Sequence, residues 1–230
     1  MIKLKGKSAS KGRVEGEVYF YRKEKTTLDK RPIYLEGEES EKLKGAIQTV
    51  KETLETERIS AEKTLGKEEA DLFLIHSMLL DDADFVGEMQ SKIKEGFAAA
   101  YAADYASKAL AERLSFSCDD YMKERAADLL EIGERLVFAL IGKKRGIELS
   151  ACGGVILCAE DLAPGETLQL DKQAIVGFAL ARGSCRSHTA ILARSMGIPA
   201  LVGVGDGLFS LAEGGRQVRR QPWRSRTTPR

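Results

Sequence analysis

The spacing of apolar and polar residues changes twice along the chain. Residues 12–23 alternate apolar and polar positions around Val14, Val18 and Phe20, a period typical of a β-strand. From residue 38 to 143 there is no proline, and apolar residues recur at intervals of three and four, as on one face of an α-helix. After residue 150 short β-type runs appear, each followed by a turn or helix signal. They occupy residues 153–160, 174–181 and 199–205.

The middle stretch predicts a set of antiparallel helices joined by short connections. We expect helices over residues 38–65 and 98–114, and two shorter helices between them with a break near residues 80–82. A further helix is expected from an Asp N-cap at position 119 or 120 to a stop at Gly142. Its apolar stripe consists of Met122, Ala126, Leu129, Leu130, Gly133, Leu136, Val137, Leu140 and Ile141.

The β-type segments lie at both ends of the chain, and the helices lie between them. A lone amino-terminal strand cannot bury its face, so it needs the later strands as partners. The sequence therefore predicts a discontinuous α/β domain from residues 1–34 and 147–215, interrupted by an inserted helical bundle domain over residues 35–146. Residues 216–230 follow as a separate basic tail.

Composition places this pattern among soluble globular proteins, since 43% of the 230 residues are apolar and 31% are charged. No apolar run approaches the roughly 18 residues of a membrane span, and no signal peptide is recognisable. The cysteines lack metal-ligand spacing, and the chain has only two histidines, so we expect no metal site and free thiols in a cytoplasmic protein. These cysteines are Cys118, Cys152, Cys158 and Cys185.

The net charge of +1 conceals an uneven distribution. Six arginines and no acidic residue lie in residues 216–230, and the remainder has 30 basic against 35 acidic residues, a net charge near −5. An arginine tail can bind nucleic acid, but this one lacks periodicity and has no interleaved aromatic residue beyond Trp223. We expect a disordered or non-native tail, no nucleic-acid or membrane partner, and an acidic body that attracts basic proteins.

One of the two histidines stands at a predicted helix start. Ser187 is a good N-cap, residues 190–196 favour a helix and Gly197 suits its end. His188 therefore lies in the first turn, where we expect the N–H groups of residues 189–191 to lack intrahelical acceptors and the helix dipole to favour an anion. This setting keeps an imidazole neutral and nucleophilic, so a phosphoryl group is a candidate ligand. Candidate contacts for that group are the hydroxyls of Ser187 and Thr189 and the guanidinium of Arg186.

The same position has a plainer interpretation, because a histidine near a helix start can simply hydrogen-bond to its neighbours or to water. No acidic residue lies close in sequence to form a triad, and neither a GxSxG elbow nor a Walker loop is present. The residues alone leave both interpretations open.

Four stretches carry a resemblance to a known family. GSCRSHTAILARSMGIPALVG (residues 183–203) resembles the phosphohistidine signature of Enzyme I of the phosphoenolpyruvate:sugar phosphotransferase system, shared more loosely with pyruvate phosphate dikinase and phosphoenolpyruvate synthase. DLAPGETLQL (161–170) and YMKERAADLLEIGERL (121–136) are similar to Enzyme I alone, and FLIHSMLLDDADF (73–85) is similar to its carrier-docking helices. The resemblance covers residues 1–215, the amino-terminal half of such an enzyme.

The resemblance implies a swivelling α/β phosphohistidine domain interrupted by a helical domain. His188 would be phosphorylated on Nε2, and the Thr167 hydroxyl would contact the imidazole. The phosphoryl group would come from phosphoenolpyruvate bound in a carboxy-terminal barrel, and would pass reversibly to a small histidine phosphocarrier protein. No cofactor is expected in this chain, with Mg²⁺ needed only by the barrel, and the default expectation for these residues is a monomer.

The resemblance also implies a surface for the carrier, with apolar residues rimmed by acids. The residues carried over are Glu68, Asp71, Met78, Leu79, Asp82, Leu114 and Arg125. The alternative for Met78 and Leu79 is a place in the bundle core, and acidic residues are often only a solvated face. His76, in the same stretch, is expected to be structural and hydrogen-bonded between helices.

The chain departs from the family pattern in three places. Ser184 and Arg186 replace a glycine and a threonine before the histidine, SASKG replaces an SPG turn, and RRQPWRSRTTPR resembles nothing in the family. We expect no use of phosphoenolpyruvate by these residues alone. Two alternatives stay open: a swivelling domain of a dikinase or synthase type of enzyme, and a non-catalytic module that only docks the carrier.

Overall fold

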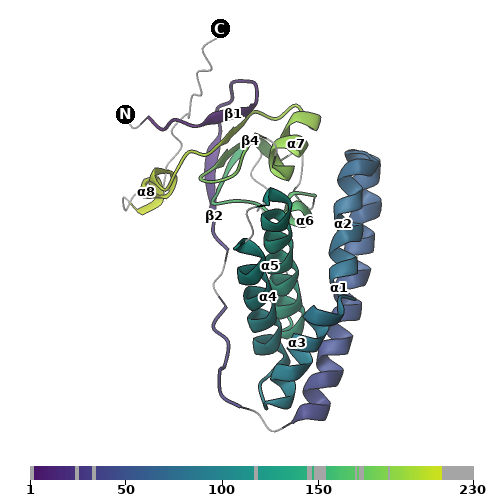
Figure 1. Cartoon of the computed structure of the whole chain (residues 1–230). Coiled ribbons are helices and arrows are strands. Elements are labelled where there is room, and N and C mark those ends of the chain that lie inside the picture. Colours follow the sequence, from purple (N-terminus) through teal and green to yellow (C-terminus); the bar gives the residue numbers. More distant parts are fainter. Residues whose placement is uncertain are drawn as a thin grey trace. The chain divides into compact units, whose positions relative to one another are not determined.

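The computed structural model describes residues 3–23, 26–32, 35–116, 119–143, 147, 154–168, 170, 174–185 and 187–213. The chain forms two compact units, one from residues 1–24 and 146–230 and one from residues 25–145 (Figure 1). The first boundary therefore falls after residue 24, whereas the sequence placed it after residue 34. The predicted basic tail lies outside the described residues.

The helical unit contains the helices that the periodicity predicts. They are α1 (Glu36–Thr64), α2 (Lys67–Leu79), α3 (Ala83–Lys94), α4 (Ala99–Ser115) and α5 (Asp120–Leu140). Helix α1 packs along α2, α3 packs against α4, and α4 packs along α5 (Figure 1). The predicted break between α2 and α3 is confirmed: Asp82 caps α3 by accepting a hydrogen bond from the N–H of Phe85 at 2.9 Å.

Small residues bring α4 and α5 close together. Ala102, Ala103 and Ala106 on α4 are fully buried, and Ser107 lies directly opposite Gly133 of α5. The predicted stripe of α5 needs correction at its edges. Ile132 is completely buried although the stripe omitted it, whereas Met122 and Leu130 are exposed, Leu130 by 46%. The positions of α4 and α1 determine which side chains of α5 are buried, and the spacing of apolar residues on α5 alone does not specify those positions.

A carboxylate from α1 replaces the missing cap of α4. The N-cap residue Ala98 has no polar side chain, and buried Glu39 accepts a hydrogen bond from the N–H of Ala99 at 2.7 Å. Its other oxygen pairs with Lys42 at 2.6 Å. The negative charge sits at the positive end of the α4 dipole, so Glu39 joins two helices that are far apart in sequence.

The other unit contains a five-stranded mixed sheet in the order β1-β5-β4-β3-β2. The strands are β1 (Lys7–Ser10), β2 (Glu17–Tyr21), β3 (Val155–Ala159), β4 (Ile175–Leu180) and β5 (Ala200–Val202). Strands β2, β3, β4 and β5 are parallel, and β1 pairs antiparallel with β5. The lone amino-terminal strand thus finds its expected partner in a strand more than 130 residues later, because Val18 pairs with Ile156.

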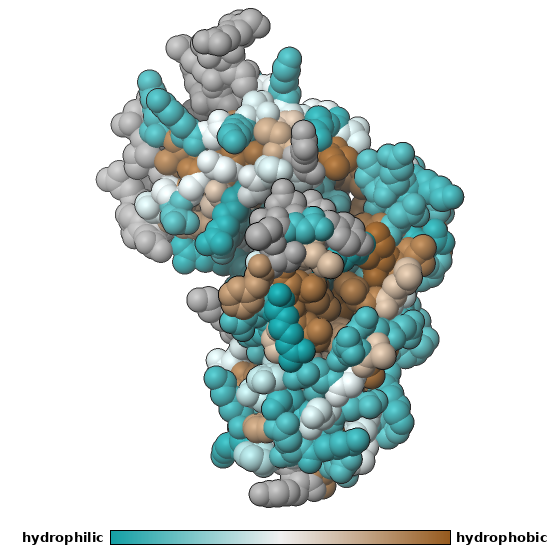
Figure 2. Space-filling model, in the orientation of Figure 1, coloured by the Kyte–Doolittle hydropathy of each residue, from teal (hydrophilic) through white to brown (hydrophobic). Residues whose placement is uncertain are grey.

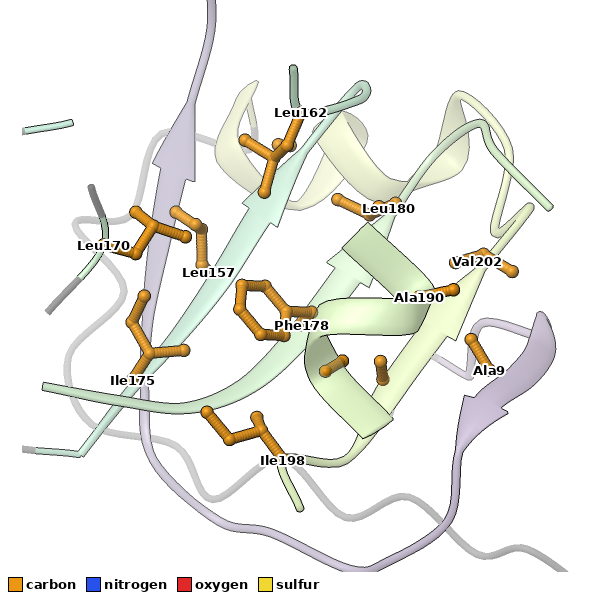
Figure 3. Packing of buried hydrophobic residues seen from close by; sticks show 13 residues of the cluster. Ala9, Leu157, Leu162, Leu170, Ile175, Phe178, Leu180, Ala190, Ile198 and Val202 are labelled. Carbon is orange, nitrogen blue, oxygen red and sulfur yellow. The ribbon is translucent and has the colours of Figure 1, made fainter. Parts of the chain in front are cut away.

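Apolar side chains cover both faces of this sheet, as the alternation along β3 requires. Leu157 faces a cluster in which the Phe178 ring is central and helix α7 (His188–Ser195) contributes Ala190 (Figure 3). Ile156 and Cys158 face the other side, where Leu208 of α8 (Gly207–Glu213) packs. Helix α7 is therefore fixed to the sheet by its buried face, which includes Ala190 and Ala193, whereas its first residue, His188, is exposed.

Candidate functional site

The candidate site lies where three neighbouring parallel strands end. The carboxyl ends of β2, β3 and β4 meet at one edge of the sheet, and ligands in open parallel sheets bind beyond such an edge. The site is formed by Tyr21 at the end of β2 with residues 22–23, by residues 160–168 after β3 and by residues 181–188 after β4. Together they hold most of the polar residues discussed below.

His188 is the first residue of α7, as predicted. Ser187 before it is extended, with φ −64° and ψ 155°, and its Oγ accepts a hydrogen bond from the N–H of Ala190 at 3.4 Å. The His188 side chain is exposed, so its ring is reachable by a reactant in solution. One expectation was wrong: the N–H of Ile191 already donates to the carbonyl of Ser187 at 3.0 Å, because the first intrahelical bond starts at the N-cap residue.

Two threonines near the histidine use their hydroxyls to hold the backbone. Thr189 is buried and its Oγ1 donates to the carbonyl of Leu162 at 3.4 Å, which ties the start of α7 to the segment after β3. Thr167 is buried in the short helix α6 (Pro164–Leu168) and donates to the carbonyl of Ala163 at 2.7 Å. Each hydroxyl keeps lone pairs that can accept, so the expected contact of Thr167 with the imidazole stays a prediction in which the ring donates.

Gly183 lies beside the start of α7. Its φ of +89° lies in the left-handed region, where a side chain is strained. The point where a Cβ would sit is 3.7 Å from Ser187 Oγ and 3.7 Å from Asp161 Oδ1. Asp161, which also accepts the N–H of Leu162 at 2.9 Å, therefore lies close to Gly183, as the helix cap Ser187 does.

Asp161 also has a perturbed acidity. Crowding by surrounding protein atoms raises the pKa of the Asp161 carboxyl, and the nearby Glu166 and Glu160 act in the same direction. The N–H of Leu162 and the ammonium of Lys23 oppose this rise. The carboxyl group of Asp161, close to Gly183, thus gives up its proton less readily than usual.

A second carboxylate joins the segments after β2 and β3. Glu166 is buried, accepts the Tyr21 hydroxyl at 2.8 Å and the N–H of Ala163 at 2.8 Å, and lies 4.0 Å from Lys23. Sequence reasoning missed Asp161, Glu166, Tyr21 and Lys23 as site residues. The only signal was the acidic residue inside the apolar surroundings of DLAPGETLQL, since the partners in β2 are about 145 residues away in sequence.

The loop before the histidine is held by an arginine. Arg194 Nη1 donates to the carbonyl of Cys185 at 2.8 Å and to that of Ala9 in β1 at 3.1 Å. Cys185 Sγ lies 3.7 Å from the carbonyl of Ser8. Arg186, a predicted phosphate contact, lies outside the described residues.

The residues expected to dock a carrier lie on three helices and the connection between α2 and α3. Glu68, Asp71 and Met78 are exposed on α2, Met78 by 64%, so the alternative of a core position for Met78 is wrong. Asp82 is exposed as the cap of α3, while Leu79, Leu114 on α4 and Arg125 on α5 are half-buried. Leu74 of α2 and Phe116 after α4 are also exposed, and apolar surface gathers on the helical unit (Figure 2).

The described residues carry two further negative findings. They contain no group of three or more His, Cys, Asp or Glu side chains placed to hold a metal ion. Among the helices in these ranges, none combines the length and the apolar character needed to cross a membrane.

Comparison with protein families matches both units. The family described as PEP-utilising enzyme, N-terminal, matches residues 5–125, and the family described as PEP-utilising enzyme, mobile domain, matches residues 152–219. The chain belongs to the PEP-utilising enzyme family. Its His188 lies in the part that matches the mobile domain, and the exposed residues of α2 lie in the part that matches the N-terminal family.

Several curated relatives of this PEP-utilising enzyme chain share one name. Proteins called phosphoenolpyruvate-protein phosphotransferase from Bacillus subtilis and Latilactobacillus sakei are 34% and 35% identical over 204 and 205 residues. Each alignment covers 88% of this chain and 36% of the relative. The chain therefore spans about a third of the length of the curated relatives it matches.

Solved structures support the same membership. A solution NMR structure of Enzyme I has a TM-score of 0.72 and 35% identity, covering 90% of this chain and 85% of that one. A structure described as the N-terminal domain of Enzyme 1, Nitrogen, has a TM-score of 0.62 and 25% identity, covering 87% of this chain and 83% of that one. The resemblance inferred from the sequence motifs is confirmed, and the combination of helical part and mixed sheet is compatible with an Enzyme I amino-terminal domain.

Proposed function

We propose that the chain is a phosphoryl relay of the bacterial sugar phosphotransferase system, in which His188 accepts a phosphoryl group and passes it reversibly to a histidine phosphocarrier protein. The observation that carries the proposal is an exposed imidazole at the capped start of α7, beyond the carboxyl edge of a parallel sheet. The name shared by the relatives supports this chemistry over that of a dikinase or synthase.

The transfer is a displacement at phosphorus. The Nε2 lone pair of neutral His188 attacks the phosphorus of the phosphorylated carrier histidine, a new N–P bond forms, and the old N–P bond breaks. The electron pair of the broken bond returns to the carrier imidazole, and the reverse reaction retraces these steps. Positioning in line and electrostatic stabilisation supply most of the catalysis in such transfers.

Several groups at the site suit a transient phosphoryl group. The Ser187 hydroxyl accepts from Ala190 and keeps its hydrogen for a phosphoryl oxygen, and the start of α7 presents partial positive charge. The carboxyl groups of Asp161 and Glu166 act in the opposite sense, since they repel negative charge. Together these groups favour a phosphohistidine that forms but is readily passed on. A contact from Thr167 or Arg186 to the phosphorylated ring is part of the proposal.

The helical unit would hold the carrier. Exposed Met78 and Leu74 form an apolar surface on α2, and the exposed acidic residues Glu68, Asp71 and Asp82 surround it. Such a surface suits a partner with an apolar centre and a basic rim. The charge near −5 of residues 1–215 adds long-range attraction. We extend the proposal to a swivelling motion of the α/β unit between carrier and donor. By resemblance, phosphoenolpyruvate and its Mg²⁺ belong to a barrel and not to the residues of this chain.

Incubation with a phosphorylated carrier tests the relay. Intact-mass measurement should show the 230-residue chain gaining one phosphoryl group, and the His188→Ala variant gaining none. Carrier binding should survive in His188→Ala, because the docking residues lie on other helices. A wild-type chain that binds the carrier and takes no phosphate would instead establish the non-catalytic docking module, and a chain that does neither would reject the relay altogether.

A further inference from the structure

A hydrogen-bonded chain of three side chains links α2 to α5 inside the helical unit. His76 of α2 places Nε2 3.1 Å from Asp128 Oδ1, and Arg125 Nη1 lies 3.3 Å from Asp128 Oδ2. Asp128 and Arg125 are both on α5, one turn apart. A buried imidazole on one helix thus holds a carboxylate on another, and that carboxylate holds a residue of the expected docking surface. Sequence spacing had assigned His76 only a structural bond between helices, which the structure confirms.

The chemistry of His76 is one-sided. The residue is 1% exposed, its ring packs edge-on to Phe73 with centroids 6.4 Å apart, and Nδ1 has no hydrogen-bond partner among the described residues. A carboxylate only accepts, so the hydrogen must be on Nε2 and the bond runs from His76 to Asp128. The Nε2–H group of His76 is therefore the donor that contacts Asp128.

The restraint on Asp128 extends to the surface. Asp128 and Arg125 side chains are only about one-fifth exposed, at 19% and 21%, so their pairing is less screened than a pair in open solvent. The hydrogen bond from His76 to Oδ1 restrains rotation of the carboxylate, so Oδ2 is held as an acceptor for the guanidinium. Arg125 has five N–H donors in a rigid fork, and a fixed acceptor on one of them orients the others.

We propose that His76 is a positioning residue for carrier docking, which acts through Asp128 to orient Arg125 on the docking surface. The inference rests on the proposed function, because it concerns the same partner. Arg125 is the one cation among the seven docking residues carried over, so its orientation decides where an acceptor group of the carrier can be met. Loss of the His76 donor removes the restraint on Asp128 Oδ1 and so weakens the orienting contact to Arg125, and the cost appears in docking rather than in the transfer at His188.

Two substitutions at His76 separate the hydrogen bond from the packing. His76→Phe keeps a ring against Phe73 and removes the donor, whereas His76→Gln places an amide N–H near the former Nε2. Calorimetric titration with a histidine phosphocarrier protein should show about 3- to 10-fold weaker binding for His76→Phe, the range of one intramolecular hydrogen bond. His76→Gln should restore the wild-type affinity. In phosphoryl transfer, His76→Phe should raise KM with kcat unchanged.

A double-mutant cycle then asks whether His76 works through Arg125. In an Arg125→Ala background, His76→Phe should have no further effect on carrier affinity. Asp128→Asn provides an independent break in the chain, since the amide can face His76 with its oxygen but then offers Arg125 no acceptor. It should weaken docking as His76→Phe does, and the two changes together should be no worse than either.

The outcomes distinguish this inference from the proposed function. Wild-type chain without measurable carrier affinity rejects the docking function and the role of His76 with it. Carrier binding with equal losses in His76→Gln and His76→Phe, or with losses that add to that of Arg125→Ala, rejects the positioning role alone. Should His76→Phe fail to fold, as thermal unfolding would reveal, Asp128→Asn in the two Arg125 backgrounds decides between the same outcomes.

Discussion

Replacing Gly133 by alanine should destabilise the helical unit, although the same change stabilises most helices. In an exposed helix interior, Gly→Ala gains roughly 1 kcal/mol of helix propensity. Here the new Cβ would lie 2.2 Å from Ser107 Oγ and 2.3 Å from Ser107 Cβ, well inside contact distance. A rotation of the hydroxyl relieves only the first clash, because Cβ moves only with the α4 backbone. Overpacking of this kind costs about 1–3 kcal/mol, so after the gain in helix propensity we expect a net loss of up to about 2 kcal/mol.

The matched control is Ser107→Gly, which opens the space from the other side. Alone it removes the hydrogen bond from Ser107 Oγ to the carbonyl of Asp104 and should cost about 0.5–1.5 kcal/mol. Combined with Gly133→Ala it removes the clash, so the double variant should be more stable than the sum of the single losses predicts. Urea unfolding followed by far-UV circular dichroism measures all three free energies of unfolding. A Gly133→Ala protein as stable as the wild type, with additive effects, would contradict the close α4–α5 contact.

Three further outcomes follow from groups that the structure places in unusual surroundings. Glu39→Gln should lower the free energy of unfolding by about 1–2 kcal/mol at pH 7. Burial opposes the charge of Glu39, but Lys42 and the N–H of Ala99 lower the pKa of its carboxyl below 4.5. The stability that Glu39 contributes is therefore present above pH 4.5 and is lost as the pH falls through the lowered pKa. The difference between the urea midpoints of wild type and Glu39→Gln should accordingly be smaller at pH 3 than at pH 7. Burial raises the pKa of the Cys158 thiol to about 12, so a thiol reagent at pH 8 should label half-buried Cys185 before Cys158, as peptide mapping would show. Gly183→Ala, at φ +89°, should cost about 1–2 kcal/mol in thermal unfolding and slow phosphate uptake from the carrier, and an unchanged melting temperature would refute the strained turn.

Local sequence signals predict most of the elements. The five helices of the bundle and the start of α7 follow from apolar spacing and capping residues, and both are properties of short stretches. Three of the parallel strands lie within the β-type runs at residues 153–160, 174–181 and 199–205. These signals are strong because a buried helix face or strand face requires apolar residues at fixed intervals.

Long-range partners decide what the sequence did not predict. Glu39 reaches Ala99 across 60 residues, and Tyr21 reaches Glu166 across 145 residues, so neither contact has a local signature. The same reason applies to Thr189. The sequence suggested its hydroxyl as a contact for the phosphoryl group, but the hydroxyl donates to the carbonyl of Leu162 in another segment. The capping pattern predicted correctly that a helix starts at His188. The packing of neighbouring segments, in contrast, determines that His188 is exposed and Thr189 is buried.

Phosphorylation of His188 is the point on which the proposed relay depends. The most direct measurement is tandem mass spectrometry, at a pH that preserves phosphohistidine, after incubation of the 230-residue chain with a phosphorylated histidine carrier. We predict a single phosphoryl group on His188 that returns to the carrier when unphosphorylated carrier is added in excess. A phosphoryl group at another residue, or one that His188→Ala still acquires, would contradict the assignment of this imidazole as the relay.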